Sequence, residues 1–71
     1  MQKDNSIEQI IGKRIQKIRQ AKGYTQQQFS EMVGFSTNYL SDVERGKSSV
    51  RVGKLAEIIN ALECSADEVF I

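Results

Sequence analysis

The sequence predicts an all-α fold, a compact domain of five short helices, and three observations lead to this prediction. Apolar residues recur at spacings of three and four along most of the chain, which is the period of one helix face. The 71 residues contain no proline. Serine or threonine precedes several apolar runs, and glycine follows several. The remaining connections are short and leave no room for a sheet. We expect residues 1–5 to be a mobile polar tail and residues 6–71 to be one domain.

The first predicted helix runs from about Ile7 to Ala21. Ser6 is a good N-cap residue, and Gly23 is placed to end the helix in the left-handed conformation. Five isoleucines form its apolar stripe, at positions 7, 10, 11, 15 and 18.

The second predicted helix begins after Thr25. Gln28 stands three residues on, which is the spacing of a capping box, and Gly34 follows the last turn. We expect its buried side chains to be Phe29, Met32 and Val33.

Ser36 caps the third predicted helix, over about residues 37–45, and Gly46 terminates it. Leu40 and Val43 form its apolar face. A fourth helix is predicted from Ser48 or Ser49 to about residue 63. Its apolar face would consist of Val52, Leu55, Ile58, Ile59 and Leu62.

The end of the chain is predicted to form one more helical turn. Ser65 and Glu68 have capping-box spacing, and Val69 and Phe70 supply the apolar residues. Cys64, just before them, is the only cysteine, so no intramolecular disulfide can form. We expect a small core thiol there. Redox sensing or pairing with a second chain is the alternative.

Charge is unevenly distributed along the chain, although the net charge is only +1. Residues 12–54 carry nine basic and three acidic side chains, whereas residues 55–71 carry four acidic side chains and no basic one. A phosphate backbone would therefore meet the first segment and avoid the second.

Composition argues against several classes of function. The chain has no histidine, no metal-ligand cluster around its one cysteine and no glycine-rich phosphate loop, so we expect neither an enzyme nor a cofactor. No segment approaches the ~20 apolar residues of a membrane span, and no signal sequence begins the chain. We therefore expect a cytoplasmic protein that makes no membrane contact.

The second and third predicted helices match the pattern of a helix-turn-helix motif. Ser30, four residues after Gln26, is the small residue that helix crossing requires, and Gly34 supplies the turn. Leu40 and Val43 face inward on the third helix. Each signal is weak alone, but this combination is typical of a motif that places its second helix in the DNA major groove.

With these residues in view, the chain resembles the phage Cro/repressor-type helix-turn-helix family, often called XRE-like. The resemblance covers about residues 7–70 and is carried by the Gly-Tyr-Thr-Gln run at 23–26, by Gly34 and by the run at 39–47. It implies a lambda-repressor-like domain that binds double-stranded DNA as a homodimer on an inverted-repeat operator. Ser30 stands where the family usually has alanine, a tolerated difference in size.

The resemblance assigns base reading to the outer face of the third helix. Asn38 can make a bidentate contact with adenine, and Thr37 offers a hydroxyl and a methyl group to thymine. Asp42 can accept from cytosine or instead orient a nearby basic residue. An ordinary solvated surface is the alternative for the set. The full set of expected base-reading residues is Ser36, Thr37, Asn38, Ser41 and Asp42.

Phosphate contacts are expected around this helix. Gln26 lies at a helix N-terminus, where free N–H groups favour an anion, and its family counterpart binds phosphate. Thr25 can assist. Arg45 and Lys47 flank Gly46 just past the third helix. Tyr39 either packs against the second helix or reaches a phosphate with its hydroxyl. For three further basic residues a solvated surface is the simpler interpretation: Arg14, Lys17 and Lys22.

Two further expectations concern structure and assembly. By the resemblance, Arg19 pairs with Glu44 and so sets the angle between the helices that carry them. One recognition helix reads few base pairs, so a homodimer is expected. Its interface would include the apolar C-terminal residues Val69, Phe70 and Ile71, unless these fold back onto the core.

The main alternative to DNA binding is a helix-turn-helix module or antitoxin that acts on a protein. Such a surface should show aromatic or apolar anchors on the third helix, whereas short polar residues occupy it here. If the protein activates transcription, an acidic patch around Glu31 would contact RNA polymerase.

Overall fold

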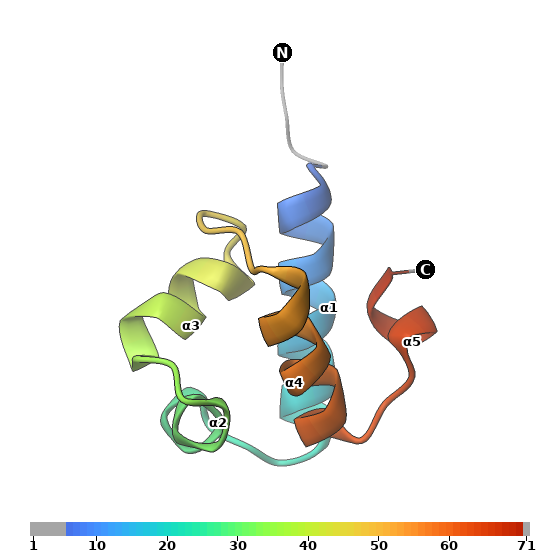
Figure 1. The fold of residues 1–71 in the computed structure, drawn as a ribbon. Helices are drawn as coiled ribbons and strands as arrows, with labels where there is room; N and C mark the ends of the chain where they lie inside the picture. The colour runs from blue at the N-terminus through green and yellow to red at the C-terminus, as the bar shows by residue number, and fades with distance from the viewer. Residues whose placement is uncertain (1–5, 71) are drawn as a thin grey trace.

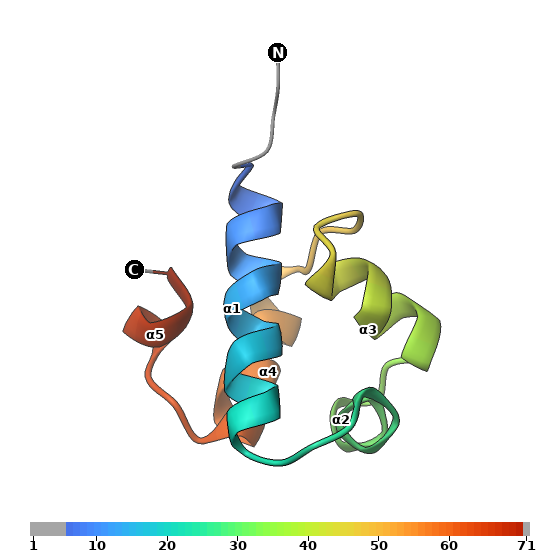
Figure 2. The ribbon, with the colours of Figure 1, turned by 180° about the vertical axis from the view of Figure 1, so that it is seen from behind.

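The computed structural model describes residues 6–70, without the side chain of Phe70, and residues 1–5 of the expected tail lie outside the described part. The described chain forms five helices and no strand: α1 (Ile7–Ala21), α2 (Gln26–Val33), α3 (Thr37–Glu44), α4 (Val52–Leu62) and α5 (Ala66–Phe70). Helices α2 and α3 lie on one side of the pair formed by α1 and α4, and α5 lies on the other (Figure 1). The view from behind shows the same arrangement (Figure 2). The predicted five-helix, all-α fold is confirmed.

The first three helices begin where local capping places them. The Thr25 hydroxyl accepts a hydrogen bond from the Gln28 N–H at 3.0 Å, and Gln28 Oε1 accepts one from the Thr25 N–H at 2.9 Å. Ser6 forms the same reciprocal capping box at the start of α1. The Ser36 side chain accepts from the Tyr39 N–H at 3.0 Å. Because these bonds satisfy N–H groups that a helix leaves free, the sequence predicts the starts of these helices closely.

The fourth helix begins later than predicted. It starts at Val52 with Arg51 as an N-cap that makes no side-chain bond, and neither Ser48 nor Ser49 caps it. The N–H groups of Lys47 and Ser48 both donate to the Asp42 carbonyl, at 2.8 and 3.4 Å. These bonds wrap the chain around the end of α3, so the residues that were expected to open α4 belong to the α3–α4 loop.

Three side chains that were predicted to lie on the apolar faces of their helices are exposed. Val52 is 84% exposed, because it lies in the first turn of a helix that begins later than expected. Met32 is 48% exposed, because Phe29 and Val33, four residues apart, occupy the inner face of α2. Ile7 is 67% exposed at the end of α1 that projects beyond the other helices (Figure 1).

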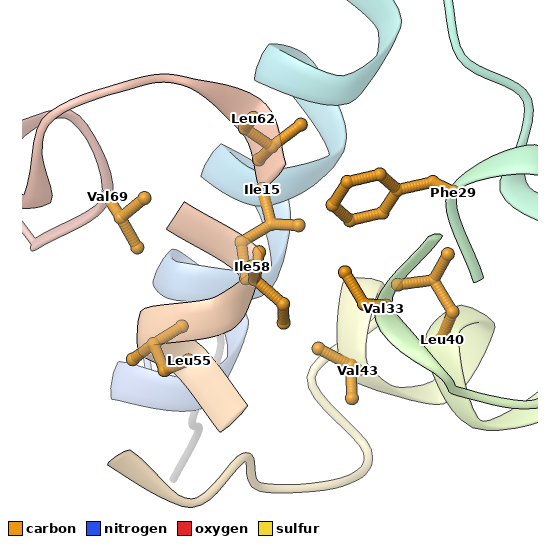
Figure 3. Close-up of a cluster of buried hydrophobic side chains, with 9 residues drawn as sticks. All are labelled: Ile15, Phe29, Val33, Leu40, Val43, Leu55, Ile58, Leu62 and Val69. Carbon is orange, nitrogen blue, oxygen red and sulfur yellow. The ribbon is translucent and has the colours of Figure 1, made fainter. Parts of the chain in front are cut away.

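The hydrophobic core lies where α1 and α4 meet the helix-turn-helix (Figure 3). Val69 joins it from α5 and is fully buried, so its side chain anchors this short helix to the core. The core is formed by Ile15, Phe29, Val33, Leu40, Val43, Leu55, Ile58, Leu62 and Val69.

A buried glycine lets α1 and α3 approach each other closely. A Cβ atom on Gly12 would overlap the Val43 carbonyl oxygen and lie 2.9 Å from the Glu44 carbonyl oxygen. Gly46, which follows α3 and has φ +78°, lies against Gln9 of α1, and a Cβ on Gly46 would be 2.8 Å from the Gln9 Cα. The end of α3 is therefore held against the backbone of α1.

Candidate nucleic-acid interface

The turn between α2 and α3 has the geometry that the motif requires. Ser30 is 1% exposed; its hydroxyl donates to the Gln27 carbonyl at 2.9 Å and lies 3.3 Å from the Thr37 hydroxyl. Gly34 has φ +76°, and the N–H of Phe35 donates to the Ser30 carbonyl at 2.8 Å. The small residue and the turn glycine thus let the two helices cross in contact.

Polar side chains gather on the outer face of α3. At 100° per residue, positions 37, 38, 41 and 42 share one side of the helix, while the buried Leu40 and Val43 take the other. Residues 36–38 are exposed, and residues 41 and 42 are half-buried. Four of the five expected base-reading residues therefore share one face of α3, and the fifth, Ser36, is the N-cap at its start.

The hydroxyl and amide groups on this face differ in how far they are engaged. The Ser36 side chain caps α3, and the Thr37 hydroxyl contacts Ser30. Within residues 6–70 the structure shows no hydrogen bond from the Asn38 side chain. The Asn38 amide is thus the group on this face best able to form two new hydrogen bonds.

Asp42 forms an ion pair with the basic residue that ends α3. Its Oδ1 lies 3.2 Å from Arg45 Nη2, and both side chains are exposed, at 41% and 60%. The arrangement matches the orienting role considered for Asp42 from the sequence. Lys47 follows two residues later and is also exposed. The end of the helix thus presents two cations beside the polar face.

A buried ion pair links the end of α3 to α1. Arg19 Nε lies 2.7 Å from Glu44 Oε2, and Arg19 Nη2 lies 3.1 Å from Glu44 Oε1. The two side chains are only 6% and 1% exposed. Arg19 also donates from Nη1 to the Tyr24 carbonyl at 2.7 Å. The pair expected between these residues is therefore present as a bidentate contact.

Gln26 extends this network to the start of α2. Its Nε2 donates to Glu44 Oε1 at 2.9 Å, which holds the side chain against the end of α3. An amide nitrogen has two hydrogens, so one remains available to a phosphate. Thr25 uses its hydroxyl as an acceptor in the cap and retains the hydroxyl hydrogen. The network of Arg19, Glu44 and Gln26 is called the ionic brace below.

Two roles were considered for Tyr39 from the sequence, packing against the second helix or binding a phosphate, and in the structure both its hydroxyl and its ring are engaged within the protein. Its hydroxyl donates to the Ser49 carbonyl in the α3–α4 loop at 2.7 Å. Its ring packs edge-on against Phe35, with 4.7 Å between ring centroids and 78° between planes. A phenol has one hydrogen and a phosphate oxygen only accepts, so Tyr39 cannot bind a phosphate while it holds this loop.

Two other side chains lie where the sequence did not place them. Arg14 donates from Nη1 to the Val69 carbonyl at 3.3 Å, so it connects α1 to α5 and is more than a solvated residue. Lys54 on α4 reaches the end of α2, with Nζ 3.4 Å from the Val33 carbonyl oxygen. A carbonyl at a helix C-terminus attracts a cation, but no local pattern identifies a lysine 21 residues away as its partner.

The predicted dimer residues require a correction. Val69 is fully buried in the core of the single chain, so its side chain is unavailable to a partner without unfolding α5. The side chains of Phe70 and Ile71 lie outside the described part of the structure. Thus the expectation for Val69 alone is corrected.

Cys64 shows no feature of a reactive thiol. Its sulfur is half-buried, 3.9 Å from the Ile59 carbonyl oxygen. Desolvation, followed by the negative charge of Glu68, raises the pKa of the thiol, so the reactive thiolate is disfavoured at neutral pH.

Neither a metal site nor a membrane span is found in the described part of the chain. Residues 6–70 bring together no group of three potential His, Cys, Asp or Glu ligands. None of the described helices combines the length and apolar character needed to cross a bilayer.

Comparisons of the sequence identify a family. Residues 15–69 match the family model described as Helix-turn-helix. The HTH-type transcriptional regulator YazB of Bacillus subtilis is 36% identical over 61 residues, which are 86% of this chain and 88% of that protein. The HTH-type transcriptional regulator y4dJ of Sinorhizobium fredii is 35% identical over 63 residues, 89% of this chain and 82% of that protein.

Solved structures agree with this result. The clp gene regulator ClgR from C. glutamicum superposes with a TM-score of 0.89 at 30% identity, covering 93% of this chain and 85% of that one. The restriction-modification controller protein C.AhdI from Aeromonas hydrophila gives 0.79 at 30% identity, covering 84% and 87%. The chain therefore belongs to the Cro/C1-type (XRE) helix-turn-helix family of DNA-binding transcriptional regulators, with the lambda-repressor-like fold and no enzymatic role.

Proposed function

We propose that this protein is a cytoplasmic, sequence-specific regulator that places α3 in the major groove of a palindromic operator. The observation that carries the proposal is the polar outer face of α3. Residues 36–38 at its start are exposed, and the Asn38 amide forms no hydrogen bond with another described residue. Base edges in the major groove present donors and acceptors that such side chains match.

Phosphate contacts would orient this face on the duplex. Gln26 keeps one amide hydrogen free beside the N-terminus of α2, and Arg45 and Lys47 present charge at the end of α3. The acidic residues of α5 lie on the far side of α1 from the helix-turn-helix (Figure 2). A net charge of +1 is therefore compatible with DNA binding, because the duplex would meet only one side of the molecule.

The regulator acts as a homodimer in this proposal. Two recognition helices on a two-fold axis would enter successive major grooves ~34 Å apart and double the sequence that is read. Phe70 and Ile71 remain the proposed apolar contacts, while Val69 is buried in the core of its own chain. Similarity to the controller protein C.AhdI and the regulator ClgR supports control of transcription, and the acidic Glu31 on α2 is available for contact with RNA polymerase.

Selection of bound duplexes from a random DNA pool tests the proposal. Salt at about 150 mM suppresses binding that depends only on phosphates. We expect enrichment of an inverted repeat with half-sites about one helical turn apart. Failure to enrich any sequence would reject sequence-specific recognition and favour a protein partner, as for a helix-turn-helix interaction module or antitoxin.

A matched pair of asparagine variants then tests the role of α3. Asn38→Ala should weaken binding to the selected duplex by ~1–3 kcal/mol and relax the preference at one base pair in each half-site. Asn60→Ala removes an asparagine that is also exposed, but on α4, and should leave affinity unchanged. Equal effects of the two substitutions in a binding titration would show that α3 does not read the bases.

A further inference from the structure

One side chain of α4 contacts the helix-turn-helix at its turn. Lys54 Nζ lies 3.4 Å from the Val33 carbonyl oxygen at the end of α2 and 5.6 Å from the centroid of the Phe35 ring. It also lies 3.2 Å from Glu57 Oε1 one turn along α4. An ammonium group that lies beside the C-terminal carbonyls of a neighbouring helix is stabilised by the carbonyl dipoles. The face of an aromatic ring stabilises the same charge through its electrons.

The contact continues beyond the turn. Phe35, in contact with Lys54, packs edge-on against Tyr39 in the first part of α3, and Tyr39 donates to the Ser49 carbonyl in the α3–α4 loop. Lys54, Phe35 and Tyr39 are called the aromatic brace below. The brace connects α4, the turn, the start of α3 and the loop, and its two aromatic rings also pack against the hydrophobic core.

We infer that Lys54 is a positioning residue for DNA recognition: through Phe35 and Tyr39 it holds the first turn of α3 and the α3–α4 loop in their DNA-binding arrangement. This inference rests on the proposed function. The first turn of α3 carries Thr37 and Asn38, and the connection to α4 carries the cations Arg45 and Lys47. A shift of ~1 Å in these segments weakens directional hydrogen bonds to bases more than it weakens contacts with phosphates.

The charge of Lys54 has two possible roles, holding the brace together or binding a DNA phosphate directly. The Lys54 side chain is 40% exposed, so direct contact with a phosphate is the competing interpretation. A phosphate contact releases a counterion and contributes ~0.9 to the slope of log affinity against log salt concentration. A positioning residue contributes nothing to that slope, because its charge is used inside the protein. The salt dependence therefore separates the two interpretations.

The first experiment compares affinities for the duplex recovered by selection and for a scrambled duplex of equal length. Lys54→Met should weaken binding to the selected duplex about three- to five-fold, with a smaller effect on the scrambled duplex and an unchanged salt slope. Lys13→Met is the control, because it removes the same charge from an exposed position on α1. The affinity of this variant for the selected duplex should change less than that of Lys54→Met. A slope reduced by ~1 for Lys54→Met would make Lys54 a phosphate ligand and overturn the inference.

The second experiment asks whether Lys54 acts through Phe35. Phe35→Leu carries no change of charge and should lower the affinity to a similar degree. The double variant should lose little more than either single variant, because both substitutions disable one unit. Fully additive losses in this cycle would show that the two residues act independently and would reject the brace. Tyr39→Phe removes only the hydroxyl bond to the Ser49 carbonyl and should therefore cause a smaller loss of affinity than Phe35→Leu.

A third measurement is independent of DNA. The Phe35 N–H donates to the Ser30 carbonyl at 2.8 Å, so its hydrogen exchange reports opening of the turn. Exchange at Phe35 should be faster in Lys54→Met than in the wild type and unchanged in Lys13→Met. If the wild type selects no duplex while this exchange result holds, the proposed function fails and the brace remains as a structural fact. Equal exchange in all three proteins would reject the brace.

Discussion

The two braces that hold α3 differ in burial and therefore in what they contribute. The ionic brace ties the end of α3 to α1 through Arg19 and Glu44, which are 6% and 1% exposed. The aromatic brace ties the start of α3 to α4 through Lys54, whose side chain is 40% exposed. Burial makes the first costly to break, whereas solvent weakens the second. One end of α3 is thus set by the fold, and the other end is adjustable at low cost.

The buried pair contributes geometry more than net stability. Desolvation of two charges offsets most of their attraction, but loss of one partner leaves an uncompensated charge in the interior. Glu44 also accepts from Gln26, so the same carboxylate sets the position of a proposed phosphate contact. A bidentate Arg–carboxylate contact fixes both distance and direction, which suits a device that sets the angle of a helix.

The largest expected effect is that of Glu44→Ala. It should destabilise the domain by ~3–5 kcal/mol, because Arg19 is left charged, buried and without its carboxylate. Urea denaturation measures this loss. Glu57→Ala breaks an exposed pair on α4 and should change stability far less. Wild-type stability of Glu44→Ala would show that the ionic brace is not needed to hold α3.

A substitution at Gly12 tests the same region through packing. Gly12→Ala forces a methyl group against the Val43 carbonyl oxygen, pushes α1 from the end of α3 and should destabilise the domain by ~1–3 kcal/mol. Gly53→Ala is a matched control in α4, where a Cβ would meet nothing within 4 Å. That control should stabilise the domain by ~0.5–1 kcal/mol through helix propensity. Melting curves that shift in the same direction for both variants would refute the close approach of α1 and α3.

The smallest expected effect on stability is that of Asp42→Asn. The Asp42–Arg45 pair is exposed on both sides, so its loss should change the free energy of unfolding by less than ~0.5 kcal/mol. DNA affinity should nevertheless change, since Arg45 loses its orienting partner beside the duplex while the negative charge is removed. A stability loss as large as that of Glu44→Ala would mean that exposure does not separate structural from functional ion pairs in this protein.

Local hydrogen bonding explains which elements could be predicted from the sequence. The starts of α1, α2 and α3 follow from Ser6, Thr25 and Ser36, because a capping bond spans only three residues. The start of α4 could not be predicted, because Ser48 and Ser49 resemble caps but the backbone at 47–48 bonds to Asp42 instead. The competing partner lies in the preceding helix and has no local signature.

The candidate site also has features that the sequence predicts and features that it does not. The outer face of α3 and the cations that follow it were predictable from helical period and motif spacing. The partners of those residues were not: Tyr39 binds the Ser49 carbonyl, Gln26 binds Glu44, and Val69 enters the core. Each of these outcomes depends on which groups the folded chain brings within hydrogen-bond or van der Waals distance.

The sequence alone determined the helical class, the helix-turn-helix spacing and the residues on the surface of α3, because periodicity and capping act within a few residues. Only the tertiary structure decided the close approach of α1 at Gly12, the contact of Lys54 with Val33 and Phe35, and the burial of Val69. These features join residues far apart in the chain, and their energies depend on distance and desolvation, which exist only after the helices have packed.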